Sequence, residues 1–137
     1  MSKPRQHLAA VALVVPDYDE AKTYYSQVLG FDVIEDVAIG EGKRWLVVAP
    51  PGSRTHLVLA KASNPAQESR IGDQTGGRVF LFLHTDNFQR DHEAFQARGV
   101  TFREAPREEA YGTVAVFKDR YGNLWDLIER RTVNLVK

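Results

Sequence analysis

The chain repeats one pattern of local signals at an offset of 69 residues. In the first copy an apolar run ends at Asp17, a stretch with helical spacing of apolar side chains follows, and Gly30 precedes a new run. In the second copy Asp86 and Gly99 stand 69 residues later. Aspartate can accept hydrogen bonds from the free amides at a helix start, and glycine adopts the left-handed conformation that ends a helix. The repeat therefore predicts two strand-helix-strand units whose helices begin after Asp17 and Asp86.

Two more strands are expected after each of these units. Turn-forming proline, glycine and asparagine residues separate the apolar runs, which span 44–49 and 55–61 in the first half and 113–118 and 124–129 in the second. Each half therefore reads β-α-β-β-β, and the fold class is α+β. The expected organisation is one domain over 1–137, with module one at 8–61, a linker at 62–77 and module two at 78–130.

Composition narrows the function classes. The 18 basic and 18 acidic residues balance, and no basic run with interleaved aromatic residues occurs, which argues against nucleic acid as a partner. The absence of cysteine excludes disulfides and thiolate chemistry and suits a cytoplasmic protein. The sequence shows no apolar run long enough to be a signal peptide or a membrane anchor, so no membrane association is expected.

Two local motifs point to a known family. Val15-Pro16-Asp17 stands before a helix that ends in the residues at 24–31, and Asp119-Arg120-Tyr121-Gly122-Asn123 joins the last two strands, with Arg120 at a position where proline is frequent. Together with the duplicated module, these motifs resemble the vicinal-oxygen-chelate superfamily of glyoxalases, bleomycin-resistance proteins and extradiol dioxygenases. The resemblance implies two modules that curve their sheets into a cup, formed within one chain or across a homodimer, and a small molecule bound in that cup.

Members of this superfamily usually hold a divalent metal with four side chains from the first and last strands of the two modules. The resemblance places these positions at Ala10, Val58, Phe80 and Asp126. Only the carboxylate of Asp126 can bind a metal, and one carboxylate does not make a site. No metal cofactor is therefore expected.

Strand alternation supports this placement independently of the family. Successive side chains of a strand point to opposite faces of the sheet. The residues of opposite parity to the four positions are all apolar, as a face packed under helices should be: Val11, Leu13, Val15, Leu57, Leu59, Val79, Leu81, Leu83, Trp125 and Leu127.

Two histidines share the parity of Asp126. His56 and His84 could form a displaced site with Asp126, since two histidines and a carboxylate suit iron or zinc. Their strand positions argue against it, because two residues along a strand already span about 6.6 Å. His84 is then expected at the rim. His56 is expected either to line the pocket or to act as a base.

Asp126 itself has two interpretations. It either pairs with an arginine, such as Arg44 or Arg78, or acts as a general base whose pKa is raised by apolar surroundings.

Four aromatic residues are candidate ligand contacts. Phe80 is expected to face a ligand, Phe82 is expected to pack in the core although it remains a candidate, and the facing of Trp45 and Tyr111 is open.

The leading hypothesis is metal-independent binding or sequestration of a small molecule, with Phe80, Val58, Ala10, Trp45, Phe82 and Tyr111 as ligand-binding candidates. The alternative is an enzyme, a lyase or isomerase of the glyoxalase type or a dioxygenase-like protein. It would use Asp126 and His56 as catalytic residues, with or without a displaced metal. A regulatory or scaffold domain without a ligand is the third possibility.

Overall fold

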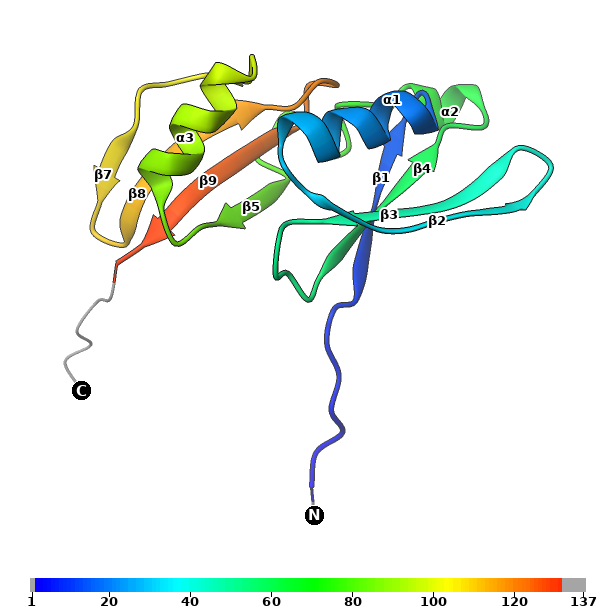
Figure 1. The fold of residues 1–137 in the computed structure, drawn as a ribbon, viewed down its shortest axis with the longest axis horizontal. Coiled ribbons are helices and arrows are strands. Elements are labelled where there is room, and N and C mark those ends of the chain that lie inside the picture. The colour runs from blue at the N-terminus through cyan, green and yellow to red at the C-terminus, as the bar shows by residue number, and fades with distance from the viewer. Residues whose placement is uncertain (1, 132–137) are drawn as a thin grey trace. The chain divides into compact units, whose positions relative to one another are not determined.

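The computed structural model describes residues 2–131. The chain divides into two compact units, Met1–Ser69 and Arg70–Lys137, each of which contains a sheet and a covering helix (Figure 1). Each unit is a β-α-β-β-β module, so the α+β fold predicted from the repeat is confirmed. The boundary between the two units, after Ser69, falls in the polar stretch that the sequence predicts as a linker.

The first unit contains a four-stranded sheet in the order β1-β4-β3-β2. Strands β1 and β4 are parallel, and the other neighbours are antiparallel. Its elements are β1 (Ala10–Val15), α1 (Tyr18–Thr23), the π-helical turn η1 (Tyr24–Val28), β2 (Asp32–Gly40), β3 (Lys43–Ala49), β4 (His56–Lys61) and the short helix α2 (Pro65–Glu68).

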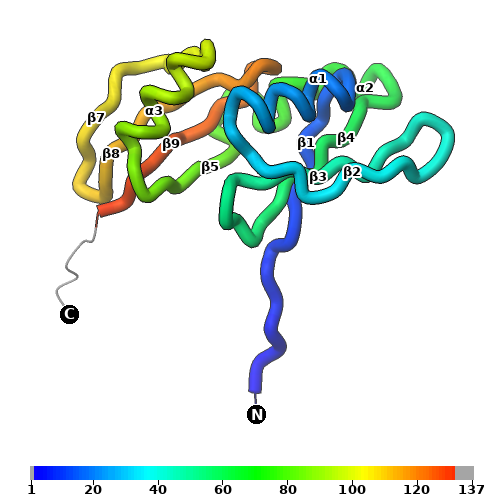
Figure 2. Tube along the Cα trace, in the orientation of Figure 1, coloured from blue at the N-terminus to red at the C-terminus, as the bar shows by residue number. Residues whose placement is uncertain are grey.

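The second unit repeats this order as β5-β9-β8-β6, with β7 also paired to β8. Its elements are β5 (Leu81–His84), α3 (Phe88–Ala97), β6 (Thr101–Phe102), β7 (Arg107–Glu109), β8 (Gly112–Lys118) and β9 (Leu124–Arg130). Figure 2 lets the reader follow the same path of the chain through each unit. Where the first unit has one long strand, β2, the second has two short ones. Pro106 lies between β6 and β7, and proline has no N–H to donate to a ladder.

One of the two predicted helix caps is confirmed and the other is wrong. The Asp17 carboxylate accepts a hydrogen bond from the Glu20 amide at 2.9 Å and begins α1. In the second unit Asn87, not Asp86, caps α3 by accepting from the Arg90 amide at 3.0 Å. Asp86 instead forms an exposed ion pair with Arg90.

The first helix is regular for only part of its predicted length. The sequence predicts one helix to about Leu29, but the α-helix ends at Thr23 and continues as the π-helical turn. The wider turn places Tyr25 in the core, fully buried and stacked on Phe31 with the ring centroids 6.1 Å apart. Gly30 then takes a positive φ of 73°, as predicted for the residue that ends the helix.

The alternation correctly predicts which face of each sheet the helix covers, although β3, β8 and β9 also bury residues on the other face. In the first unit Leu13, Val15 and Leu59 are fully buried on the face that α1 covers. In the second, Trp125 and Leu127 are buried, and the Trp125 ring stacks on Phe117 at 5.7 Å between centroids. This aromatic packing under α3 forms the core of the second unit.

The turn that joins β8 to β9 is organised around a buried carboxylate. Asp119 accepts hydrogen bonds from the Asn123 amide at 3.0 Å, from the Asn123 side chain at 2.9 Å and from the Trp125 indole at 3.1 Å. These bonds satisfy a carboxylate that is only 5% exposed. They give the turn motif a structural role.

No helix among residues 2–131 is long and apolar enough to cross a membrane.

Candidate functional site

Each sheet has an open face, which is defined here as the face opposite its covering helix. In the first unit this face carries Val58, which lies opposite Ala12 on β1 and Val47 on β3. His56 shares the face, two residues earlier on β4, and lies opposite Ala10. The open face of the first unit is therefore largely small and apolar, with one histidine.

Trp45 also belongs to the open face of the first unit. It lies two residues before Val47 on β3, so its side chain points to the same side, and it is opposite Val37 on β2. Its indole N–H donates to Glu35 at 2.6 Å, and its ring is 41% exposed. The structure thereby decides the facing of Trp45, which the sequence leaves open.

The open face of the second unit has a carboxylate in its middle row. Asp126 on β9 lies between Phe82 on β5 and Val116 on β8. Directly opposite residues in neighbouring strands point to the same face, so these three side chains are neighbours. The next row along the sheet contains His84, Ile128 and Val114.

The expectation that Phe82 packs in the core is wrong. Phe82 is 62% exposed, on the open face, directly opposite Asp126. Phe80 lies just before β5, where its amide donates to the Leu124 carbonyl at 2.8 Å, one row away from Asp126. The residue directly opposite Asp126 is therefore Phe82. In the first unit Ala12 lies directly opposite Val58, and Ala10 is two residues earlier on β1.

Burial raises the pKa of the Asp126 carboxyl above its ordinary value of 3.8. The nearby Arg107 guanidinium opposes the increase in pKa, and the Glu104 carboxylate adds to it. Within the described residues, the buried Oδ1 atom of Asp126 has no hydrogen-bond partner. A half-buried carboxyl in this position can hold a proton at higher pH than an exposed aspartate, or donate it to a ligand.

A network around Arg107 borders Asp126, and sequence reasoning missed it. The Arg107 guanidinium donates to Glu104 at 3.0 Å and to Glu109 at 2.9 Å, and these carboxylates, with Tyr111 nearby, raise its pKa. Arg107 faces Val114 across the β7–β8 ladder, so it lies at the edge of the open face. The only sign of this network in the sequence is that acidic and basic residues follow one another at Glu104, Arg107 and Glu109. Such a pattern is also typical of an ordinary solvated segment.

Neither arginine that the sequence offered as a partner hydrogen-bonds to Asp126. Arg44 donates to Asp36 at 2.8 Å and to Asp19 at 2.7 Å, and this pairing lowers the pKa of Asp36 to about 2. Arg44 is thus part of the contact between β3 and α1. Within residues 2–131 no ion pair connects Arg78 to Asp126 either.

A family model described as "Glyoxalase/Bleomycin resistance protein/Dioxygenase superfamily" matches residues 7–127. The chain belongs to this superfamily. It is 55% identical over 127 residues to an uncharacterized protein of Shewanella frigidimarina, and the match covers 91% of this chain and 94% of that protein.

Two solved structures resemble the chain along nearly all of its length. The structure of UcmS2 matches with a TM-score of 0.79 and 33% identity, and the match covers 92% of this chain and 99% of the UcmS2 chain. The structure of TnmS3, an antibiotic-binding protein from Streptomyces sp. CB03234, matches with a TM-score of 0.76 and 32% identity, covering 95% and 100% of the two chains.

The superfamily's usual metal does not fit the residues that this member carries. Ala10, Val58 and Phe80 have no donor atoms, and the residues found beside Val58 and Asp126, which are Ala12 and Phe82, have none either. In residues 2–131 no three or more histidine, aspartate or glutamate side chains are grouped as metal ligands. Of these residues, only Asp126 could bind a cation, through its single carboxylate.

We expect the Asp126 carboxyl to titrate above 3.8, and Arg107→Gln to move its pKa higher still. The substitution removes the nearest cation that favours the charged carboxylate. Carbon-detected NMR of the aspartate carboxyl groups across an acid titration measures both values, with Asp126→Asn to assign the signal. Arg54→Gln, which removes an exposed arginine between β3 and β4, is the matched control and should leave the value unchanged. An Asp126 pKa at or below 3.8 would contradict the electrostatic description of the site.

Proposed function

We propose that the protein binds a small molecule with an aromatic or otherwise apolar body, without a metal, and acts by binding or sequestering it. The observation that supports this most directly is the middle row of the second unit, where Phe82 and Val116 flank Asp126. A largely apolar face with a small number of polar groups is the usual composition of a ligand site.

The exposure of the aromatic ring is informative. Phe82 is 62% exposed, whereas Leu81 and Leu83 on the opposite face of the same strand are half-buried, so the Phe82 ring does not belong to the core. An exposed phenylalanine ring offers a large contact area for a ligand, and aromatic stacking contributes about 0.5–1.5 kcal/mol beyond area burial. Asp126 would then supply the polar contact that orients the ligand.

The comparisons support a binding role of this kind. TnmS3 is described as an antibiotic-binding protein, and its structure matches this chain along nearly all of its length. We infer a related role here, in which affinity comes from apolar and aromatic contacts. The absence of cysteine, which suits a reducing compartment, leads us to place this role in the cytoplasm.

The enzyme hypothesis rests on Asp126 as a proton donor or acceptor. Its raised pKa and its unpartnered oxygen favour this role. The hypothesis also needs a second group, for which the sequence offers His56. Turnover of a bound ligand that is lost in both Asp126→Asn and His56→Gln would favour the enzyme over the binding protein.

The binding proposal predicts that Phe82→Ala weakens binding of 2-naphthol, a neutral aromatic probe, by about tenfold, since loss of the stacking contact is worth about 1.4 kcal/mol. Fluorescence titration measures the dissociation constant. Leu8→Ala, which truncates a side chain that is 66% exposed before β1, should leave it unchanged. Equal binding by the protein and by Phe82→Ala would place the ligand elsewhere.

The purified protein is expected to hold far less than one transition-metal ion per chain, because three of the four ligand positions lack donors. The test is elemental analysis of untagged protein, purified without a chelator and then challenged with zinc, nickel, manganese and ferrous iron. A tightly held stoichiometric ion that disappears in Asp126→Ala would make the enzyme hypothesis the better one.

We also propose a homodimer. The edge strand β2 exposes Val33, Ile34, Val37 and Ile39, and an exposed apolar edge tends to pair with another chain. Val37→Lys should then shift the protein toward the monomer, because it places a charge on this surface. Sedimentation equilibrium measures the mass, and a mass near 15.5 kDa for the unmodified protein at all micromolar concentrations would refute the dimer.

A further inference from the structure

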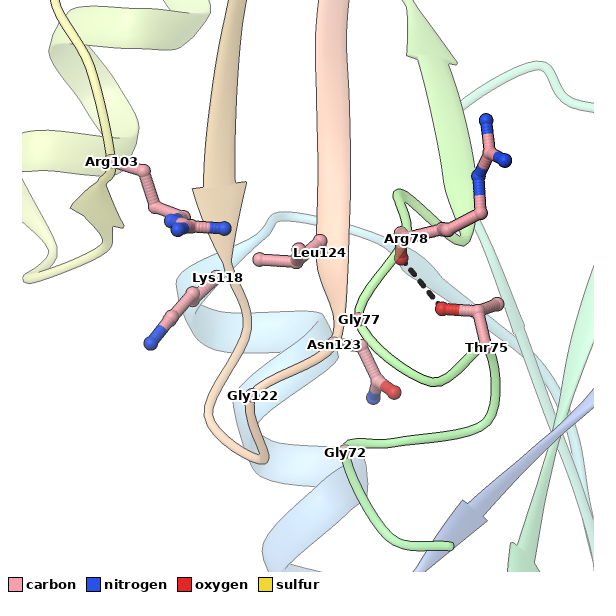
Figure 3. A pocket seen from close by; sticks show the side chains of 9 residues that line it. All are labelled: Gly72, Thr75, Gly77, Arg78, Arg103, Lys118, Gly122, Asn123 and Leu124. Atoms are coloured by element: carbon pink, nitrogen blue, oxygen red, sulfur yellow. Dashed lines mark hydrogen bonds between the residues drawn. The ribbon is translucent and has the colours of Figure 1, made fainter.

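The second unit contains a cavity of about 340 Å³ at one end of its open face (Figure 3). Its walls come from the loop before β5, from the end of β8 and from the start of β9, and they include Thr75, Arg78, Lys118 and Leu124. Arg103, which follows β6, completes the lining on the far side of β8. A cavity of this size is within the range of small-molecule sites.

The charged residues that line this cavity are all cationic. Arg78, Arg103 and Lys118 line it, and no lining residue is an aspartate or a glutamate. Within the described residues, none of these three cations forms an ion pair, in contrast to Arg44 and Arg107. In a chain whose formal net charge is zero, three unpaired cations around one cavity are a local excess of positive charge.

The carboxylates nearest in sequence to these cations are engaged elsewhere. Asp119, which follows Lys118, is buried and binds Asn123 and Trp125. Glu104, which follows Arg103, accepts hydrogen bonds from Arg107. Asp126 is two residues beyond Leu124 on β9 and is not among the residues that line the cavity.

The loop before β5, which forms one wall of the cavity, is held by close packing and by a hydrogen bond. The loop that forms one wall packs against the β8–β9 turn at Gly72, where a Cβ would come within 1.8 Å of the Tyr121 carbonyl oxygen. The Thr75 hydroxyl donates to the Arg78 carbonyl at 2.6 Å and stabilises the same loop. Figure 3 shows Arg103 reaching toward β8 and Leu124, while the side chains of Arg78 and Lys118 extend outward. These long side chains have rotatable stems, so they can turn toward an anion that enters.

We propose that this cavity binds an oxyanion, the phosphate or carboxylate group of a small molecule, through Arg103 and Lys118 with support from Arg78. Guanidinium groups bind such oxyanions through paired N–H donors, and lysine adds a mobile positive charge. This site does not depend on the aromatic ligand proposed above. The two sites are close, however, because Lys118 and Leu124 form the row of the sheet next to Val116 and Asp126. A single ligand with an apolar body and an anionic end would satisfy both.

The test is calorimetric titration of the full chain with inorganic phosphate, benzoate and phenyl phosphate at low ionic strength. We expect at least one of the three to bind, and the double variant Arg103→Gln/Lys118→Gln to weaken it by about tenfold or more, since hydrogen bonds to charged groups contribute about 1.5–3 kcal/mol. Stronger binding of phenyl phosphate than of phosphate would identify an organic anion as the ligand, and equal binding would identify the free ion.

The control is Arg54→Gln/Lys61→Gln, which removes the same charge from exposed positions of the first unit and should retain binding. Arg103→Lys keeps the positive charge and should retain part of the affinity. Far-UV circular dichroism confirms that each variant is folded. Absence of binding for all three anions, or equal weakening in the control double variant, would overturn the oxyanion site. Loss of 2-naphthol binding in Phe82→Ala with anion binding intact would show that the two sites are separate functions.

Discussion

Each sheet of this protein packs one face against its own helix and leaves part of the other face exposed, and the rest of the structure depends on that asymmetry. In the first unit Leu13, Val15 and Leu59 are fully buried, whereas Ala10 and Ala12 on the same sheet are exposed. Burial of apolar side chains is worth roughly 1.5–3 kcal/mol each, so the helix-facing side supplies most of the stability of a unit. The open face is only partly packed: Phe82 and Ala12 are exposed, whereas Val114 and Ile128 are buried.

This division explains how the open face can change its chemistry while the fold persists. A metal ligand in this fold projects from the open face, so replacing it by alanine, valine or phenylalanine leaves the helix-facing core intact. In this protein the row of Phe82, Asp126 and Val116 is apolar on both sides of its one carboxylate. Such a surface can recognise a ligand by shape, by aromatic contact and by one polar group.

Local signals in the sequence predicted the fold but were less accurate at the site. The 69-residue repeat, the cap at Asp17 and the alternation of faces were sufficient for the two modules, because each depends on a few residues that are neighbours in sequence. The cap at Asp86 was wrong because Asn87, one residue on, offers an equally good acceptor. Counting residues from a motif does not give the strand register, and the parallel pairing puts Phe82, which was expected in the core, directly opposite Asp126 and exposed.

The electrostatic surroundings of Asp126 were not predictable from local signals. Pro106 lies between β6 and β7, and the pairing of β7 with β8 puts Arg107 opposite Val114. That arrangement depends on contacts between segments far apart in sequence.

The charged side chains of the second unit differ in their pairing between the two ends of the sheet. At one end, Arg107 is held between Glu104 and Glu109 and is neutralised by them. At the other end, Arg78, Arg103 and Lys118 surround a cavity that contains no carboxylate in its lining. Asp126 lies between the two ends, and burial shifts it toward its neutral form. The open face therefore presents an apolar middle with a net positive end, and a molecule with an apolar body and an anionic group is complementary to both.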